Sequence, residues 1–231
     1  MKLICFLTLC LLSNFLVRAQ EQKKVYTVNA GQTLDQGLPV EVRYAYPEFK
    51  AGSAHFRAGT QVGSKLNFSF VHEEMQFING ADTLAVDREG DIRFIAIEAD
   101  TFYFQKFWIR QIAVSAKSRL GVKRSLVLAK AEKEGAFGQM SAGTSIDAVE
   151  KLNTPNAVAR KLTLNEVLSF TTVDLYYFAD KFGNFTQASK KNLVNMFGNS
   201  TPGFEKFLEK NKFNYNKEAD MKAIFDYLSD H

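Results

Sequence analysis

The stretch "MQFINGADTLAVDREGDIRFIAIEADTFYF", from Met75 to Phe104, repeats one short pattern: an apolar run, then Ala-Asp-Thr, then another apolar run. The aspartates of the two copies are Asp82 and Asp100. They can be a catalytic pair, or they can end two turns in which each carboxylate accepts backbone N–H groups and the following threonine begins a strand. Catalytic carboxylates must face each other across a cleft, and nothing in this pattern imposes that placement. The repeat therefore predicts a turn that the fold uses twice.

Short apolar strands separated by turn residues continue on both sides of this repeat. Asn79-Gly80 predicts a type I′ hairpin turn between strands at 75–78 and 83–86. Further strands are expected at 40–46, 54–57, 65–71, 92–97, 101–104, 106–114 and 122–128. Lys65, Asn67 and Ser69 alternate with apolar residues, which predicts one solvent-facing side for their strand. The region 25–128 is thus predicted to be an antiparallel β-rich domain, either a meander or a barrel-like sheet.

The chain changes character after residue 128. Residues 129–160 are rich in small and polar side chains without periodicity, which predicts a loop or linker. Residues 161–231 indicate a small α+β unit, with strands at 162–164 and 167–178 followed by about three helices. Ser189 is expected to cap a helix over 190–197, Thr201 with Pro202 to begin the second, and Asn216 to cap a third over 217–228. The predicted fold class is α+β.

The first residues have the features of a secretory signal peptide. Lys2 precedes an apolar run over 3–12, and Val17 and Ala19 stand at the −3 and −1 positions before Gln20. We therefore expect residues 1–19 to be removed and the protein to be exported to the periplasm, the outer envelope or the medium. Both cysteines lie inside this segment, at Cys5 and Cys10. The mature protein would then be free of disulfides and would depend on ordinary core packing.

The charge balance excludes nucleic acid as the expected partner. The chain carries 29 Lys and Arg against 25 Asp and Glu, and these charges are spread along the sequence apart from a mildly basic stretch over 117–133. A nucleic-acid-binding domain concentrates a larger positive excess. After residues 1–19 no segment is long and apolar enough for a transmembrane helix. The 21 phenylalanines are interpreted as sheet core and cross-strand pairs, in preference to a carbohydrate-stacking surface.

No motif nominates a catalytic, cofactor-binding or metal-binding residue. In the cluster His72-Glu73-Glu74, the first and third side chains would share one face of a strand, which is half of a site, whereas zinc needs three or four ligands. No serine lies in a Gly-x-Ser-x-Gly turn. Gly135 and Gly138 lack the Lys-Ser/Thr of a phosphate-binding loop. N-glycosylation sequons, which matter only in a eukaryotic secretory route, begin at Asn67, Asn184 and Asn199.

Several stretches together resemble one family of exported proteins. They are Tyr46-Pro47-Glu48-Phe49-Lys50-Ala51-Gly52, Lys65-Leu66-Asn67-Phe68, Glu74-Met75-Gln76-Phe77-Ile78, Asp82-Thr83-Leu84-Ala85, Asp100-Thr101-Phe102-Tyr103-Phe104, Lys133-Glu134-Gly135-Ala136-Phe137-Gly138 and Lys190-Lys191-Asn192-Leu193. Their order and spacing are similar to a group of exported Bacteroidota proteins without an assigned activity. The resemblance implies a Gram-negative envelope location and supplies no site residues. It also makes Asp82-Thr83-Leu84 similar to the Asp-Ser/Thr-apolar acceptor for protein O-glycosylation in that phylum, with Thr83 as the modified residue.

These observations favour a non-catalytic envelope or periplasmic protein with a binding or structural role. Its expected partner is an envelope protein or a polysaccharide, and no cofactor is expected. The alternative is a carboxylate-dependent hydrolase of an envelope polymer, which would place two carboxylates about 5–10 Å apart across a deep pocket.

Overall fold

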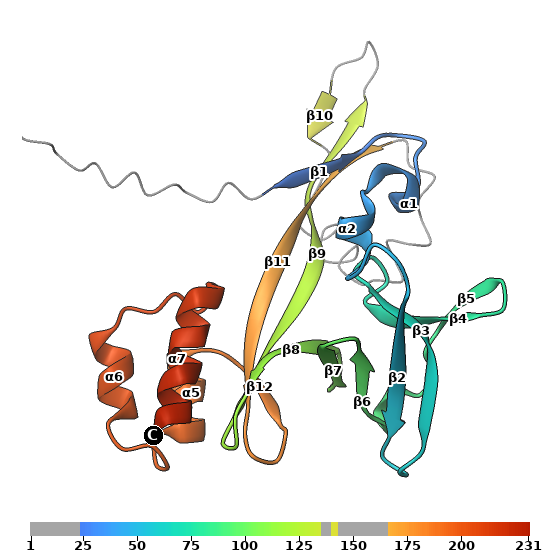
Figure 1. Ribbon diagram of the computed structural model, residues 1–231. Helices are drawn as coiled ribbons and strands as arrows, with labels where there is room; N and C mark the ends of the chain where they lie inside the picture. Colours follow the sequence, from blue (N-terminus) through green and yellow to red (C-terminus); the bar gives the residue numbers. More distant parts are fainter. Residues whose placement is uncertain (1–23, 135–139, 143–165) are drawn as a thin grey trace, which may run out of the picture.

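The computed structural model describes residues 24–134, 140–142 and 166–231 (Figure 1). The strands are β1 (Val25–Val28), β2 (Lys50–Phe56), β3 (Gln61–Ser69), β4 (Glu74–Asn79), β5 (Asp82–Ala85), β6 (Ile92–Ile97), β7 (Asp100–Phe104), β8 (Trp108–Val114), β9 (Arg119–Glu134), β10 (Met140–Ala142), β11 (Glu166–Ala179) and β12 (Phe185–Gln187). The helices are α1 (Leu34–Gly37), α2 (Val40–Arg43), α5 (Lys190–Phe197), α6 (Phe204–Lys210) and α7 (Glu218–Asp230). The strand predicted at 162–164 and most of the predicted linker lie outside the described residues.

Within these ranges the strands form one antiparallel sheet. Its order is β1-β11-β9-β8-β7-β6-β2-β3-β4-β5, with β10 beside β9 and β12 beside β11. The two end strands, β1 and β5, do not pair with each other, so the sheet is open and the barrel-like alternative is wrong. The coarser prediction, an antiparallel β-rich protein that ends in helices, is confirmed.

A long hairpin links the two predicted units. β9 pairs with β11 from Arg119 opposite Ala179 to Lys133 opposite Glu166. β9 therefore continues to Glu134, inside the segment expected to be a linker, and β10 pairs with its end. The strand predicted at 167–178 is confirmed, but it lies in the same sheet as the N-terminal strands (Figure 1).

Both copies of the Ala-Asp-Thr repeat form two-residue hairpin loops. The loops are Gly80-Ala81 between Asn79 and Asp82, and Glu98-Ala99 between Ile97 and Asp100. The first loop residue has a positive φ in each copy, 62° at Gly80 and 49° at Glu98. The predicted turn is thereby confirmed in both places. The predicted type I′ turn is wrong. It would require positive φ at both Asn79 and Gly80, and only Gly80 has a positive φ.

Residues 40–43 form helix α2, where a strand was predicted. Val42 lies four residues beyond Leu38, which lies four beyond Leu34, and all three side chains are buried. This row packs with Leu128 and Leu168 of the long hairpin. Burial against the hairpin therefore outweighs the β propensity of the valines.

The alternation expected for β3 also fails at two residues. Asn67 and Ser69 were predicted to face solvent, but each is only 1 % exposed. The Asn67 side chain accepts the Tyr46 backbone N–H at 3.1 Å and donates to the Tyr46 carbonyl at 2.8 Å. Because both of its polar groups are satisfied, Asn67 can be buried, where it fixes the chain segment before β2.

The C-terminal helices pack on one face of the long hairpin. Their apolar side chains join Leu120 and Phe178 in a single buried cluster. Ser189 caps α5 as predicted, accepting the Asn192 backbone N–H at 3.2 Å. The helix α6 begins at Phe204, later than Thr201-Pro202, because Gly203 takes a positive φ of 78°. The residue before α7 is Lys217 and not Asn216.

Candidate functional site

The aspartates of the repeat do not meet. In the sheet, β4, β3, β2 and β6 lie between β5, which carries Asp82, and β7, which carries Asp100. Asp82 is exposed. The Asp100 carboxylate accepts the Tyr46 hydroxyl at 2.6 Å and pairs with Arg110 at 3.2 Å. The expected carboxylate-to-backbone bonds are therefore replaced, at Asp100, by side-chain partners from other segments.

The cluster His72-Glu73-Glu74 does not form half of a metal site. His72 and Glu73 lie in the turn between β3 and β4, and Glu73 has a φ of 52°. Glu73 pairs with Lys123 at 3.3 Å, whereas Glu74 accepts from the Gln76 amide at 2.8 Å. Among the described residues, no three His, Cys, Asp or Glu side chains form a group that could hold a metal ion.

The modification sites predicted from sequence differ in access. Thr83 is exposed on β5, at the free edge of the sheet, so its O-glycosylation stays a prediction. Asn67 is buried and hydrogen-bonded, which makes its sequon unreachable in the folded protein. Asn184 is exposed in the turn before β12.

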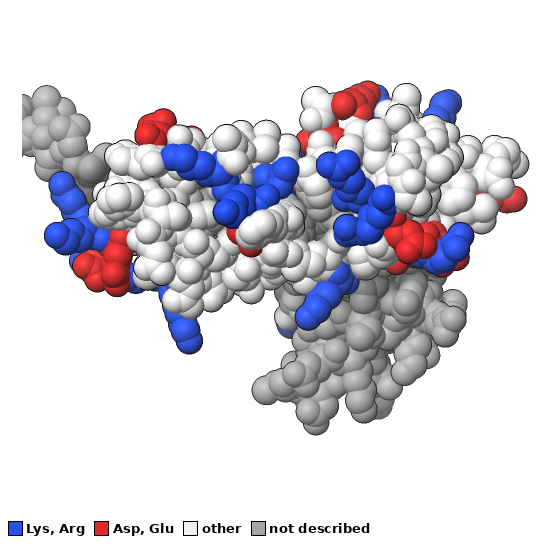
Figure 2. Space-filling view, turned by 90° about the horizontal axis from the view of Figure 1, so that it is seen from below, with Lys and Arg blue, Asp and Glu red and all other residues white. Residues whose placement is uncertain are grey.

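A basic groove is lined by residues from the turns after β2 and β11 and from the start of β9, segments that lie at the lower end of Figure 1. Four cationic side chains and five aromatic residues contribute to its lining: Arg57, Arg93, Arg119, Lys181, Phe94, Tyr103, Phe104, Phe182 and Phe185. Its volume is about 410 Å³. Figure 2 views the molecule from this end and shows Lys and Arg side chains on both sides of a shadowed hollow. This is the most strongly charged hollow among those described here.

The sheet brings these four cations together from distant parts of the chain. Arg57 follows β2, Arg119 begins β9, and Lys181 lies in the turn between β11 and β12. Arg93 lies at a β-bulge, since His55 and Phe56 of β2 pair with Phe94 and Ile92 and skip the residue between them. A bulge re-aims the side chain of the extra residue. In the strand register, Arg57 and Arg93 lie at one end of the sheet, whereas Arg119 and Lys181 lie at the opposite end. A register shift in β8 between Gln111 and Ala113 marks a bulge, and bulges bend the sheet. The bent sheet brings residues from both ends into the lining of one groove.

The groove carries an uncompensated positive charge. Among the described residues, its lining contains no carboxylate. Within the part of the chain that the structure describes, none of the four cations forms an ion pair. The Nε of Arg119 is also buried, and it forms no hydrogen bond with any of the described residues. The site therefore offers N–H donors and charge to an anion.

Aromatic rings support three of the cations. The Arg119 guanidinium lies 5.7 Å from the Tyr103 ring centre, Arg93 lies 5.9 Å from Phe94, and the Lys181 amine lies 5.1 Å from Phe182. Such contacts stabilise a cation by about 0.5–1 kcal/mol at exposed sites. They hold the charges in place without neutralising them.

Asp180 is the acidic residue next to Lys181 in sequence, and its carboxylate is hydrogen-bonded within the turn that contains it. Its carboxylate accepts the backbone N–H groups of Phe182 at 2.8 Å and Asn184 at 3.0 Å, and the Asn184 amide at 3.2 Å. Partial desolvation opposes ionisation, but these hydrogen bonds from Asn184 and Phe182 outweigh it and lower the pKa of Asp180. Asp180 thus stays ionised and fixes the loop that carries Lys181 and Phe182.

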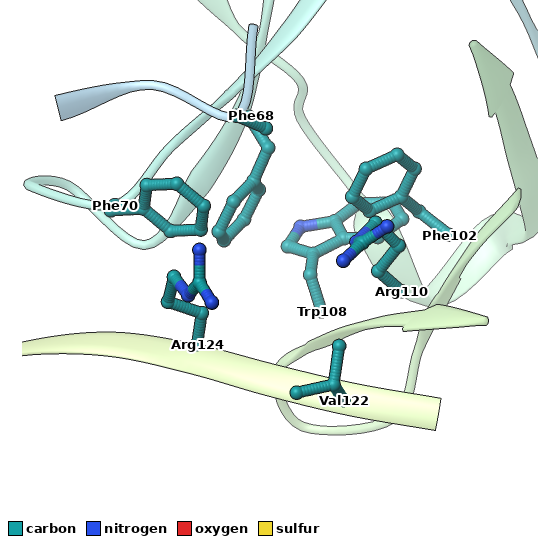
Figure 3. Close-up of a pocket in the computed structure, with 8 residues that line it drawn as sticks. Phe68, Phe70, Phe102, Trp108, Arg110, Val122 and Arg124 are labelled. Atoms are coloured by element: carbon teal, nitrogen blue, oxygen red, sulfur yellow. The ribbon is translucent and has the colours of Figure 1, made fainter. Parts of the chain in front are cut away.

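A second hollow, the aromatic pocket, lies inside the curled sheet (Figure 3). Phe68, Phe70, Phe102 and Trp108 surround it, and the guanidinium groups of Arg110 and Arg124 point toward it. The space open to the centre of a water molecule is about 30 Å³, which is room for about two waters. This hollow is too small for a ligand of ordinary size.

The charges at the aromatic pocket are already balanced. Arg124 donates two hydrogen bonds of 2.7 Å to Asp174, and Arg110 pairs with Asp100. Burial, followed by the hydrogen bond to Asp100, raises the pKa of Tyr46 far above its usual value, so its hydroxyl remains a donor. Trp108 has a buried Nε1 without a hydrogen-bond partner among the described residues. The pocket is best explained as packed core with internal ion pairs.

A third hollow, of about 490 Å³, lies beside the basic groove and is more apolar. Met196, Phe197 and Leu228 of the helical unit line one part of it, and Lys117 lines another. Lys181 and Phe182 line both this hollow and the basic groove. The loop over 180–184 therefore separates a basic hollow from an apolar one.

The groove was missed by sequence reasoning because its residues are far apart along the chain. One local signal was present, since three of the cations are adjacent to a phenylalanine in Phe56-Arg57, Arg93-Phe94 and Lys181-Phe182. Each of these pairs lies at or near the end of a predicted strand. This signal identifies pairs of a basic and an aromatic residue, but it does not show that the pairs come together in the folded protein.

Comparison of the chain with family profiles, with functionally characterised proteins and with solved structures found no match. None of the helices in the described ranges is long and apolar enough to cross a bilayer. Any function must therefore be argued from the geometry of the hollows themselves.

Proposed function

We propose that this protein is an exported, non-catalytic protein of the cell envelope that binds an anionic ligand in the basic groove. The observation that carries the proposal is the convergence of Arg57, Arg93, Arg119 and Lys181 on one hollow, to which no carboxylate of the described residues contributes. Both kinds of partner expected from the sequence, an envelope protein or a polysaccharide, can supply anionic groups.

Gathering like charges lowers the stability of the folded protein unless something compensates for their repulsion. The three cation–aromatic contacts supply a part of that compensation. A bound anion would supply the rest. Hydrogen bonds between ionised partners are about twice as strong as those between neutral groups. The groove thus has the charge and the donors for binding.

The alternative function, a carboxylate-dependent hydrolase, requires two carboxylates that face each other across a pocket. Within the described ranges, the linings of the three hollows contain one carboxylate, that of Asp180. Its oxygens accept three hydrogen bonds from the turn that contains it. The geometry of the hollows therefore supports binding over hydrolysis.

Retention on a heparin column tests the groove, because heparin is a soluble polyanion. The test variant is Arg93→Gln with Lys181→Gln, which removes two exposed groove cations. The control is Lys206→Gln with Lys212→Gln, which removes two exposed lysines from outside the groove lining and changes the net charge equally. We expect the wild type and the control to elute at similar salt and the groove variant to elute earlier. Equal shifts in both variants would mean that retention reports net charge alone, and the proposal would fail.

Export is tested separately, by N-terminal sequencing of the protein from fractionated cells. The expected sequence begins at or near Gln20, in the envelope fraction or the medium. A cytoplasmic protein that retains Met1 would remove the basis for an envelope role and would leave the groove to be explained by a different partner.

A further inference from the structure

We infer that the groove end of the molecule docks on an anionic lipid surface, with Phe182 entering the interfacial layer and the groove cations binding the headgroups. This inference rests on the proposed function, since it names the partner of the basic groove. Its chemistry is that of peripheral membrane anchors, which combine an exposed apolar group with surrounding Lys and Arg.

The first observation is the exposure of Phe182. Its side chain is 78 % exposed, the highest value among the large apolar residues exposed in the described ranges. The others are all aliphatic, namely Val25, Val62, Leu84 and Val114. An exposed large ring is unfavourable in water and becomes favourable when an apolar or interfacial environment covers it.

The second observation is that the loop holds Phe182 outward in a fixed geometry. The Asp180 carboxylate accepts the Phe182 backbone N–H at 2.8 Å, and the Gly183 N–H bonds to the Asp180 carbonyl at 3.0 Å. Gly183 has a φ of 86°, which a residue with a side chain adopts only under strain. A ring presented by a rigid turn loses little conformational freedom on binding.

The third observation is the arrangement of the charges around this ring. Arg57 and Lys181 lie in turns, Arg119 at a strand end, and Lys117 in the turn between β8 and β9, all at the lower end in Figure 1. Figure 2 shows that Lys and Arg side chains gather over this face. Each Lys or Arg near an anionic membrane adds to the attraction within about a Debye length. A flat anionic surface can reach all of these turns at once.

Other polyanions explain the charges but not the ring. A soluble acidic polysaccharide held by charge has no need of a fixed, exposed phenylalanine. Binders of single-stranded nucleic acid stack successive bases on several rings. Here Phe94 and Tyr103 are partly buried beside other rings of the protein, His55 at 4.2 Å and Phe185 at 5.6 Å between ring centres. A bilayer interface uses one ring and several cations together.

Co-sedimentation with lipid vesicles tests the inference. The vesicles consist of phosphatidylcholine alone, or of equal parts of phosphatidylcholine and phosphatidylglycerol. The test variant is Phe182→Ser, and the control is Leu84→Ser, which removes an exposed apolar residue from the β4–β5 hairpin. We expect binding to the mixed vesicles only, a loss of about tenfold in affinity for Phe182→Ser, and wild-type affinity for Leu84→Ser.

Three outcomes would overturn the inference. One is equal binding by Phe182→Ser and the wild type, and another is an equal loss in Phe182→Ser and Leu84→Ser. The third is the absence of vesicle binding while groove-dependent retention on heparin persists, which would leave the proposed anion binding intact and identify a soluble polymer as the better partner. If the groove variant Arg93→Gln with Lys181→Gln alters neither heparin retention nor vesicle binding, the proposed function fails as well.

Discussion

The basic groove and the aromatic pocket contain the same kinds of residue in opposite electrostatic states. Each places arginines beside aromatic rings. In the aromatic pocket, Asp100 and Asp174 neutralise the arginines, and the open space is small. In the basic groove the described part of the chain supplies no carboxylate to the lining, and the volume is about 410 Å³.

This contrast separates residues that stabilise the fold from residues that are available to a ligand. A paired arginine has its charge satisfied within the protein, and removing its partner lowers stability. An arginine or lysine without a partner contributes little to folding and is repelled by its neighbours. The comparison therefore predicts large stability effects at the aromatic pocket and small ones at the groove.

The largest expected difference in unfolding free energy is between one aromatic residue of each region, Trp108 of the aromatic pocket and Phe182 of the basic groove. Trp108 is 3 % exposed, so Trp108→Ala should lower the free energy of unfolding by about 3–5 kcal/mol. Phe182 is 78 % exposed, and Phe182→Ala should change it by no more than about 0.5 kcal/mol. Urea unfolding of the two variants provides the comparison. Similar losses would show that Phe182 packs in solution, and its assignment as an exposed anchor would be wrong.

The next effect concerns the paired charges. Asp174→Asn removes the negative charge opposite Arg124 and replaces one of the two accepting oxygens by an NH2 group, and should cost about 1 kcal/mol because the pair is partly exposed. The control is Glu209→Gln, which breaks the more exposed pair with Lys190 and should be close to neutral. Chemical denaturation at low salt measures both. If Asp174→Asn leaves the free energy of unfolding unchanged, the proposed distinction between paired and unpaired arginines would be wrong.

A smaller effect depends on pH. Burial, followed by the nearby charge of Asp174, raises the pKa of Tyr176 to about 12 from a normal 10.0. Between these values the unfolded chain has released the tyrosine proton and the folded protein has kept it, so stability falls as the pH rises above about 10. Tyr176→Phe should make that decline shallower in urea midpoints measured from pH 9 upward. Parallel curves for the variant and the wild type would contradict this. Other tyrosines with raised pKa values contribute the remaining slope, among them Tyr44, Tyr46, Tyr177 and Tyr215.

The smallest effect is expected in the groove itself. Arg93 is exposed and forms no ion pair with the described residues, so Arg93→Gln should leave the unfolding free energy unchanged or slightly higher. The same variant should weaken heparin retention. Thermal unfolding and column retention, measured on one preparation, check both halves of the prediction. A clear loss of stability would show that Arg93 is a structural residue.

Local features of this protein were determined by the sequence. The repeat around Asp82 and Asp100 predicted two turns, and both are present because a two-residue hairpin loop needs only its own residues and the adjacent strand ends. The cap at Ser189 and the apolar spacing of the C-terminal helices depend on residues within one or two turns of helix. The residues in such interactions are close together in the sequence, so the interactions can be predicted from it.

The tertiary structure decided the burial of individual residues. Asn67 alternates like a solvent-facing residue and is buried because the backbone of Tyr46 satisfies its amide. Val42 has a strand propensity and lies in a helix because Leu128 and Leu168 cover it. Phe207 has the spacing of a buried ring but is only partly buried, stacked on Tyr227 at 3.9 Å, whereas Phe204 is fully buried. In each case the deciding partner lies far away along the chain.

The candidate site, like the burial of these residues, was decided by the tertiary structure. Arg57, Arg93, Arg119 and Lys181 become neighbours only when β2, β6, β9 and β11 take their places in one sheet. The sequence set their positions at turn ends, through the alternation of strands and breakers. The pairing of β2 with β6 brings Arg57 and Arg93 together, and the bend of the sheet through β7 and β8 brings Arg119 and Lys181 to them. Strand order is fixed by the long-range burial of apolar faces, a property of the whole sheet that no single segment encodes.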